Sequence, residues 1–374
     1  PFRLCTSGAT VFAPGVNLTD FSAIYQSVFT PAESGNVVFE FYSCGGTQLL
    51  VNGEEVKKFT NKHGSRGTSY GMYVEANKPY KIEIKFQYFS GDAQLNFDLG
   101  FKRDADIKSS VAKVKDADVV IFVGGISPSL EGEEMGVDLE GFKRGDRTDI
   151  ELPAVQRELI KALYNAGKKV VFVNCSGSPI GMEPETKYCQ AILQAWYPGQ
   201  SGGKAVADVL FGDYNPAGRL PVTFYRNISQ DYNMAGRTYR YFKGDPLFPF
   251  GYGLSYTTFK YGNIQLPGTV TVGETVKVTV PVTNNGNYDG DEVVQLYLKK
   301  QDDTDGPNKT LRAFKRIHIP AGQTVNVELE LTPKQLEWWD NQTNTMRTMP
   351  GKFDIMIGNN SQNSNLQVQT IELK

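Results

Sequence analysis

The sequence predicts a multidomain protein in which an α/β sandwich with a mostly parallel sheet is flanked by all-β domains. Two periodicities of hydrophobic residues support this fold class. Residues 1–101 and 262–374 alternate apolar and polar side chains, which is typical of strands with one buried face. Between them, helical patterns alternate with continuous apolar runs, which indicates parallel strands buried on both faces. The length of 374 residues is that of two or three domains.

The amino-terminal β domain contains two clearly alternating segments, 80–89 and 94–101. Asn52-Gly53 is a strong signal for a hairpin with a two-residue turn. The stretch 57–71 is polar and rich in glycine and serine, so we expect a long loop there.

The α/β domain is predicted to span residues 102–236. Val155, Leu159 and Leu163 recur every four residues and are expected to form the buried face of one of its helices. In sheets of this kind, ligands bind at the carboxyl ends of the strands. The predicted helices are 104–117, 152–167, 186–196 and 202–212, and the predicted strands are 118–125 and 168–175.

The carboxyl-terminal part begins with an aromatic- and glycine-rich connector at 237–261, which we expect to be ordered by its rings. From residue 262 to 374 the period of two returns, interrupted by Asn-Asn-Gly, Asp-Gly and Pro-Gly sequences that mark turns. Several short strands over this length favour an immunoglobulin-like sandwich.

Composition narrows the possible functions. A net charge of −2 gives no electrostatic reason to expect nucleic acid or an anionic membrane as partner. The chain has only 2 histidines, which disfavours histidine-based catalysis, and its 4 cysteines lack the spacing of a zinc site. Residues 198–205 lack the first glycine and the final Ser or Thr of a phosphate-binding loop. We therefore expect neither a cofactor nor a metal.

A cluster of acidic residues follows the predicted strand 118–125. Glu131, Glu133 and Glu134 fall within four positions, and a long charged stretch at 141–153 comes soon after. A solvated loop, a calcium site and a proton-transfer group are the three interpretations, and calcium is disfavoured because no EF-hand-like spacing is present. The length of the charged loop is unusual for a plain crossover between parallel strands, which favours proton transfer.

Long ordered motifs resemble glycoside hydrolase family 3, whose members include β-xylosidases and β-glucosidases. Residues 119–163 and 197–225 resemble the carboxyl-terminal α/β domain of that family, and 239–259 resembles the segment that leads into its fibronectin type III-like domain. Residues 21–56 resemble the protective-antigen-type β domain that family members often carry as an insert. The pair of aspartates that binds calcium in sugar-binding versions of that insert is replaced by the stretch 43–46, Ser-Cys-Gly-Gly.

The resemblance implies a retaining, exo-acting β-glycosidase that removes terminal β-xylosyl or, second, β-glucosyl residues. "SLEG" falls on the Glu-Gly of the general acid/base in this family, which selects Glu131, with Glu133 and Glu134 as alternatives. The aspartate nucleophile is expected on an amino-terminal barrel, which this chain does not contain and which would be a companion chain or a lost half.

The resemblance also implies neighbours for the acid/base. Met135 and Phe142 are expected on the leaving-group side or, alternatively, in packing against the barrel. Arg147 or Arg144 would orient the glutamate or tie down the loop. An oligosaccharide or aryl glycoside is the expected ligand, a homodimer is left open, and the bacterial periplasm or exterior is the expected location. The rival hypothesis is a non-catalytic carbohydrate-binding or scaffold fragment.

Overall fold

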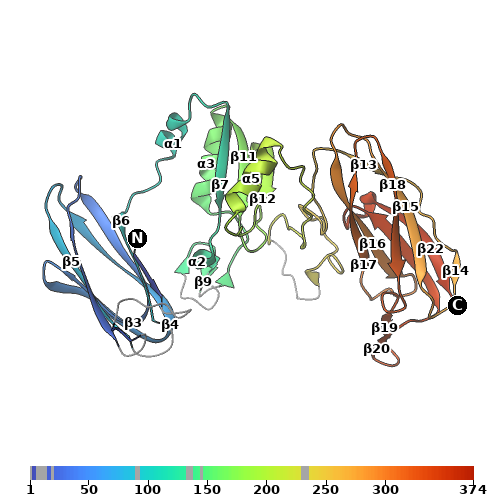
Figure 1. The fold of residues 1–374 in the computed structure, drawn as a ribbon, viewed down its shortest axis with the longest axis horizontal. Coiled ribbons are helices and arrows are strands. Elements are labelled where there is room, and N and C mark those ends of the chain that lie inside the picture. The colour runs from blue at the N-terminus through green and yellow to red at the C-terminus, as the bar shows by residue number, and fades with distance from the viewer. Residues whose placement is uncertain are drawn as a thin grey trace. The chain divides into compact units, whose positions relative to one another are not determined.

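The computed structural model describes residues 2–5, 15–17, 21–88, 93–131, 138–143, 146–228 and 236–374 (Figure 1). The chain divides into two compact units. The first comprises 1–110 and 132–146, and the second comprises 111–131 and 147–374. Each unit has a hydrophobic core of its own. The boundaries predicted from the sequence, after residues 101, 236 and 261, are not tested by this division and stay predictions.

The first unit is built around an antiparallel sheet in the order β1-β6-β3-β5-β2, with β4 paired to β3. Ile82, Ile84 and Phe86 are buried along one face of β5, as the alternation predicts. Asn52 and Gly53 form the turn between β3 and β4, with φ values of 53° and 88°. The strands are β1 (Phe2–Cys5), β2 (Ser22–Phe29), β3 (Gly35–Val51), β4 (Glu54–Val74), β5 (Tyr80–Gln87) and β6 (Gln94–Phe101).

The long loop predicted at 57–71 is wrong, because this stretch lies within β4. β4 pairs with β3 from Gly35↔Val74 to Val51↔Glu54, which satisfies the backbone groups on the side that faces β3. It pairs with no other strand of the described sheet, and an edge strand tolerates polar residues and glycine better than a central one.

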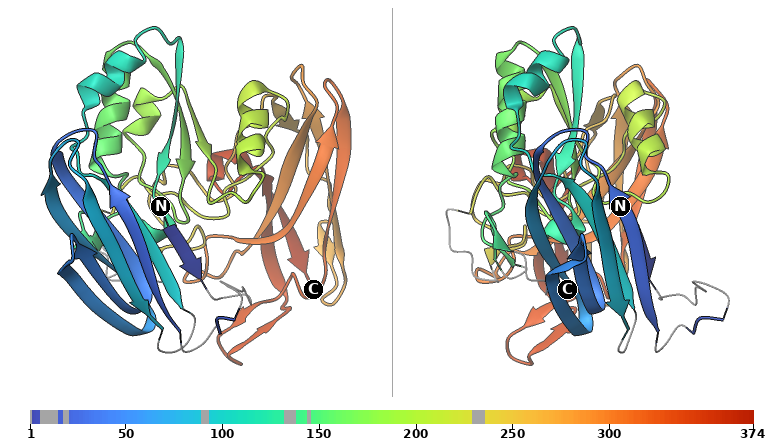
Figure 2. Two further views of the ribbon diagram at one scale, coloured as in Figure 1. Left: turned by 60° about the vertical axis from the view of Figure 1, so that its left-hand side comes forward. Right: turned by 90° about the vertical axis from the view of Figure 1, so that its left-hand side faces the viewer.

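The second unit begins with a parallel sheet in the order β12-β11-β7. Figure 2 shows helices along one face of this sheet, and α3 contacts both β7 and β11. The strands are β7 (Val119–Gly125), β11 (Lys169–Cys175) and β12 (Ala191–Gln194), and the helices are α1 (Ile107–Lys113), α2 (Pro128–Glu131), α3 (Ala154–Asn165), α4 (Glu185–Tyr188) and α5 (Gly202–Phe211). Between α2 and α3 the chain forms three two-residue strands, β8 (Asp138–Leu139), β9 (Phe142–Lys143) and β10 (Asp146–Arg147). Apart from Arg147, these strands belong to the first unit.

Two expectations about this part are corrected by the structure. The helix predicted at 186–196 is wrong: α4 is a single short turn, and Ala191–Gln194 form β12, which extends the parallel sheet beside β11. Burial of β7 on both faces is also wrong, since Val119, Ile121 and Val123 are 47%, 45% and 63% exposed.

The buried face of α3 differs slightly from the predicted one. Ile160 and Leu163 are buried, whereas Val155 is 46% exposed. The helices predicted at 152–167 and 202–212 are otherwise confirmed, and Gly212 ends α5 with a φ of 85°.

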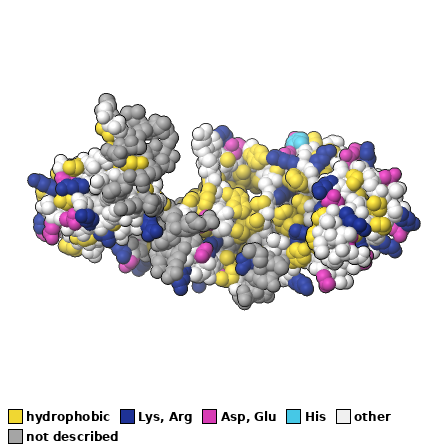
Figure 3. Space-filling view, turned by 90° about the horizontal axis from the view of Figure 1, so that it is seen from below, with side chains coloured by type: hydrophobic (Ala, Val, Ile, Leu, Met, Phe, Trp, Pro, Cys, Tyr) yellow, Lys and Arg dark blue, Asp and Glu magenta, His cyan; other side chains and the backbone are white. Residues whose placement is uncertain are grey.

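The connector at 237–261 is ordered by aromatic contacts, as predicted. The rings of Tyr239 and Phe250 stack at 4.3 Å between centroids, and those of Phe248 and Tyr252 at 5.1 Å. Hydrophobic side chains gather near the middle of the view in Figure 3.

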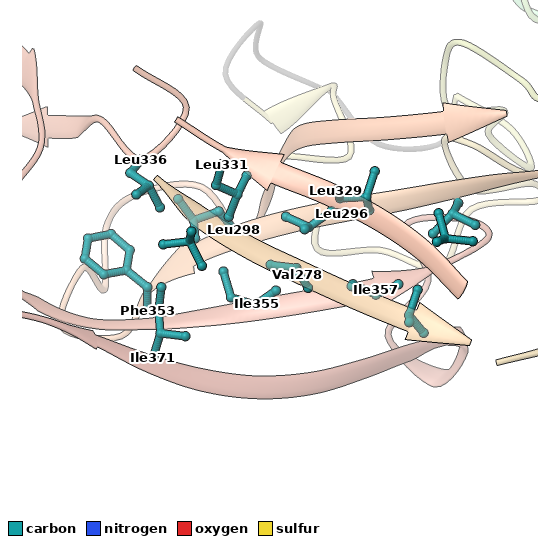
Figure 4. Packing of buried hydrophobic residues seen from close by; sticks show 14 of the residues in the cluster. Val278, Leu296, Leu298, Leu329, Leu331, Leu336, Phe353, Ile355, Ile357 and Ile371 are labelled. Carbon is teal, nitrogen blue, oxygen red and sulfur yellow. The ribbon is translucent and has the colours of Figure 1, made fainter. Parts of the chain in front are cut away.

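The carboxyl-terminal sandwich consists of a three-stranded sheet, β13-β15-β18, and a five-stranded sheet, β14-β22-β21-β16-β17. Figure 4 shows Val278, Leu329 and Ile355 in the core between them, where each is at most 4% exposed. Burying such a side chain contributes about 1.5–3 kcal/mol. The strands are β13 (Phe259–Tyr261), β14 (Thr269–Val270), β15 (Val276–Asn284), β16 (Gly290–Lys300), β17 (Thr310–Ile319), β18 (Thr324–Leu331), β21 (Gly351–Gly358) and β22 (Leu366–Leu373), with a separate pair β19 (Trp338–Asp340) and β20 (Thr345–Arg347).

The predicted combination of an α/β layer with all-β domains is therefore confirmed. Among the residues that the structure describes, no helix has both the length and the apolar composition needed to cross a bilayer.

Candidate active site

Three neighbouring parallel strands each deliver one polar side chain to a single site. Glu131 ends α2, which follows β7, while Ser178 lies shortly after β11 and Tyr197 shortly after β12. The carboxyl ends of adjacent parallel strands lie at the same edge of a sheet, which is where ligands bind in such folds.

Short backbone features set the direction of each connection. Ser127 starts the turn of α2, because its carbonyl accepts the N–H of Glu131 at 2.9 Å and its Oγ accepts the N–H of Leu130 at 3.2 Å. After β12, Trp196 adopts a φ of 56°, which is uncommon for a bulky residue and turns the chain just before Tyr197.

The Glu131 carboxylate accepts one hydrogen bond on each oxygen. Ser178 Oγ donates to Oε1 at 2.6 Å, and Tyr197 Oη donates to Oε2 at 2.6 Å. Burial, together with the hydrogen bond to Glu131 and the charge of that carboxylate, raises the pKa of Tyr197, so this phenol stays a donor. The two hydroxyls hold the half-buried carboxylate in one orientation.

Gly177 forms one wall of the site. A Cβ atom at this position would lie 2.7 Å from Glu131 Oε2 and 2.7 Å from Tyr197 Cε2, closer than any side chain permits. The carboxylate and the phenol ring therefore occupy their positions only because residue 177 has no side chain.

Arg147 acts on this site through Ser178. Its Nη1 donates to Ser178 Oγ at 3.1 Å and to the Pro179 carbonyl at 3.0 Å. Burial lowers the pKa of Arg147, while the charges of Asp149 and Glu131 oppose that shift. The guanidinium thus holds the loop that carries Ser178 and adds positive charge near the carboxylate. The orienting role expected of Arg147 stays a prediction.

A partly buried ion-pair network supports the loops behind the site. Arg157 Nε donates to Glu185 Oε1 at 2.7 Å, and its Nη1 donates to Glu151 Oε2 at 2.6 Å. Glu185 is 0% exposed, and Arg157 Nη2 also donates to the Gly181 carbonyl at 2.8 Å. One side chain on α3 therefore ties together α4 and the loops after β10 and β11.

The exits of the strands are fixed by polar contacts. The Gln156 amide bonds the N–H and the carbonyl of Gly125, both at 2.7 Å, and Asn174 Nδ2 donates to Gln194 Oε1 at 2.6 Å. Gly125 has a φ of 120°, and a Cβ there would lie 2.0 Å from the Cys175 carbonyl oxygen, so only glycine fits.

The structure brings together two of the predicted site residues, Glu131 and Arg147. Glu133, Glu134, Met135 and Arg144 lie outside the described residues.

Phe142 belongs to the first unit, where it is buried in β9, so its expected place at the leaving group stays a prediction. Ser178 and Tyr197 were missed by the sequence analysis, although both follow apolar segments at strand ends. Within the described ranges, no group of three or more His, Cys, Asp or Glu side chains is placed to hold a metal ion.

Comparison with protein families identifies the chain. Residues 16–256 match the description "Glycosyl hydrolase family 3 C-terminal domain", and residues 292–361 match a fibronectin type III-like domain. The chain belongs to glycosyl hydrolase family 3. The resemblance stated from the sequence motifs is thereby confirmed, and Glu131, Ser178 and Tyr197 all lie within the matched C-terminal domain.

Individual members of family 3 are similar over long stretches. A xylan 1,4-beta-xylosidase from Xylanibacter ruminicola is 51% identical, over 100% of this chain and 44% of that protein. A periplasmic beta-glucosidase from Salmonella typhimurium is 38% identical over 68% of this chain and 34% of its own length. The crystal structure of a beta-glucosidase from Kluyveromyces marxianus shares the fold, with a TM-score of 0.79, 22% identity and coverage of 95% of this chain and 44% of that one.

The chain spans less than half the length of these family 3 relatives. The part of each relative that it does not match is therefore longer than the part that it does.

Proposed function

We propose that this chain is the carboxyl-terminal part of a retaining, exo-acting β-glycosidase and that Glu131 is its general acid/base. The observation that carries this proposal is the Glu131 carboxylate held by two hydroxyl donors at the carboxyl edge of a parallel sheet in a family 3 domain. A carboxyl group with a fixed orientation and a dedicated site is what proton transfer to a glycosidic oxygen requires.

The proposed mechanism has two steps. In the first, the protonated Glu131 donates its proton to the glycosidic oxygen while the bond to the anomeric carbon breaks, and an aspartate nucleophile forms a glycosyl ester. In the second, the Glu131 carboxylate removes a proton from water, which attacks the anomeric carbon and releases the aspartate. Ser178 and Tyr197 keep the carboxyl group aimed at the same oxygen in both steps.

The nucleophile is proposed to come from an amino-terminal barrel segment that accompanies this chain. Support comes from the chain's coverage of only 44% of the xylosidase relative. Terminal β-xylosyl residues are the first choice of substrate because that relative is named a xylan 1,4-beta-xylosidase, and β-glucosyl residues are the second.

The periplasm or the exterior of a bacterium is the proposed location, supported by the relative named a periplasmic beta-glucosidase. A homodimer is also proposed as the assembly to test first, by the elution volume of the complete enzyme in gel filtration.

The test is the Glu131→Gln variant of the complete enzyme. Losing proton transfer is expected to lower kcat about 10²- to 10⁴-fold on unactivated xylobiose, and far less on aryl xylosides whose leaving group needs no proton. Glu140→Gln changes an exposed glutamate in the same loop region and is expected to leave both rates unchanged.

Equal losses on both substrate classes would contradict the assignment of Glu131. The same leaving-group pattern in Glu133→Gln or Glu134→Gln, with a normal Glu131→Gln enzyme, would move the acid/base to that residue. Loss in none of the three variants would favour a non-catalytic carbohydrate-binding role for this part of the protein.

A further inference from the structure

A cleft of about 850 Å³ lies where the aromatic connector meets the five-stranded sheet of the carboxyl-terminal sandwich. Its lining comes from the connector at 239–249, from β16 and β21, and from the segment 361–368. Neither Glu131 nor its hydroxyl partners take part in it. This volume is within the range of clefts that bind small ligands.

A buried lysine forms part of the lining. Lys309 is only 5% exposed, and its Nζ donates to the Ser361 carbonyl at 2.7 Å and to Asn363 Oδ1. An ammonium group has three donors, and both of these partners are neutral. Among the described residues no carboxylate lies within ion-pair distance of it, although buried charges are ordinarily paired.

A second lysine increases the positive potential at the same place. Lys299, in β16, also lines the cleft, and its charge adds to burial in lowering the pKa of Lys309 to about 8. Two lysines that line one cleft and repel one another are both stabilised by an anion that binds near them.

The acidic residues of the lining have other partners. Asp245 forms an ion pair with Arg226 at 2.8 Å. Asp354 faces Lys299 across the strand pair, but its Oδ1 accepts hydrogen bonds from Gln301 at 2.7 Å and Thr370 at 2.9 Å. The described contacts include no ion pair between either lysine and Asp354, which keeps its negative charge beside Lys299. With Lys243, the lining holds three lysines against the two aspartates, so its balance of charge is positive.

The rest of the lining suits the other parts of a sugar. Met356, Leu366 and Val368 supply apolar surface for the C–H faces of a ring. Hydroxyl groups would find amide and hydroxyl partners of the kind that sugar sites use, namely Asn308, Gln362, Asn363 and Ser364.

We propose that this cleft binds an acidic sugar, a hexuronate unit whose carboxylate lies between Lys309 and Lys299 and whose hydroxyls face the amide side chains. The site is independent of Glu131 and goes beyond the proposed glycosidase activity. The cleft would bind an acidic branch of a polysaccharide, or an acidic neighbouring chain, at a place separate from the site of hydrolysis.

The test is calorimetric titration of the complete enzyme with D-glucuronate and, in parallel, with D-glucose, which has a hydroxymethyl group in place of the carboxylate. We expect glucuronate to bind at least about tenfold more tightly, and Lys299→Gln to remove most of that difference. Lys315→Gln alters an exposed lysine of the neighbouring β17 and is expected to leave binding unchanged. Glu131→Gln is also expected to bind glucuronate normally, which separates this proposal from the proposed function.

Equal affinity for glucose and glucuronate would overturn the proposal, as would glucuronate binding that Lys299→Gln does not weaken. Sulfate or acetate that binds as tightly as glucuronate would show a simple anion site and would overturn the assignment to a sugar. Lys309→Met provides a second variant, and its thermal unfolding checks that the loop it contacts remains folded.

Discussion

At the scale of single residues, the orientation of Glu131 depends on groups from two other strand ends. One hydrogen bond to each carboxylate oxygen leaves the group no free rotation about its last bond, which reduces the reorganisation that proton transfer requires. We therefore propose that Ser178 and Tyr197 position the proposed acid/base, and we expect their removal to affect turnover more than binding.

Tyr197→Phe is the sharpest test of that role. A hydrogen bond to a charged group contributes about 1.5–3 kcal/mol, so we expect kcat to fall by about one to two orders of magnitude while KM changes little. Steady-state kinetics of the complete enzyme measures both. Tyr164→Phe removes a hydroxyl from a half-exposed ring that lies at a tilt against the ring of Tyr188, and we expect it to leave kcat and KM unchanged. A rise in KM alone would show that Tyr197 binds substrate and does not position Glu131.

Gly177→Ala tests the wall behind the carboxylate. The new methyl group would lie 2.7 Å from Glu131 Oε2, so the carboxylate must move, and we expect at least about a tenfold loss of kcat. Gly199→Ala is the matched control because nothing lies within 4 Å of its added Cβ. Wild-type kinetics in Gly177→Ala would mean that Glu131 functions in another position.

The resemblance selected Glu131 directly, but no pattern in the sequence pointed to its two partners. Ser178 belongs to a Ser-Gly-Ser-Pro stretch that looks like an ordinary turn. Tyr197 follows β12, but the sequence predicted a helix over 186–196, so no strand end was expected beside this residue. Side chains that meet through the pairing of strands are visible in a sequence only when every strand is assigned correctly.

At the scale of elements, the errors have a common physical cause. Ala191–Gln194 contain good helix formers, and β4 contains residues that rarely form strands, yet both pair with long neighbouring strands. Tertiary pairing overrides intrinsic propensity, which differs between residues by less than about 1 kcal/mol. The sandwich strands, by contrast, were predicted correctly because burial and propensity agree there.

The α3–α4 connection gives a prediction about stability. Arg157→Met would leave Glu185, which is 0% exposed, without its counter-ion, and we expect unfolding free energy to fall by about 3–5 kcal/mol. Urea denaturation measures this. Adding Glu185→Gln should recover part of the loss, and Arg226→Met, which breaks more exposed ion pairs, should cost no more than about 1 kcal/mol. If Arg157→Met lost no more stability than Arg226→Met, the network would not be what holds these elements together.

The turn that Lys309 contacts gives a prediction about pH. Its pKa is lowered from 10.5 to about 8 by burial, so the unfolded chain binds more protons at this residue between those two pH values. This residue's contribution to stability therefore rises with pH in that window, by up to about 1.4 kcal/mol for each pH unit. In urea denaturation, the free energy of unfolding of the wild type should rise relative to that of Lys309→Met as the pH increases across the window. A difference that stays constant with pH would mean that Lys309 titrates normally.

At the scale of the whole molecule, β7 stands out because its apolar face is uncovered. Val119, Ile121 and Val123 are 47%, 45% and 63% exposed, and the strand pairs on one side only, with β11, among the described residues. A parallel sheet is ordinarily covered on both faces. The longer relatives contain enough additional chain to cover it, so we expect the accompanying amino-terminal segment to pack on this face.

Val123→Asp tests that packing. A charge in the middle of a buried apolar face is costly, so a separately expressed amino-terminal segment should no longer copurify with the variant chain. The same substitution should make the chain more soluble when it is alone, because it interrupts an exposed apolar face. Val368→Asp places the same charge at a similarly exposed valine on β22, 57% exposed, and should retain the amino-terminal segment. Undiminished copurification of Val123→Asp would show that the segment binds elsewhere and that β7 is covered by something else.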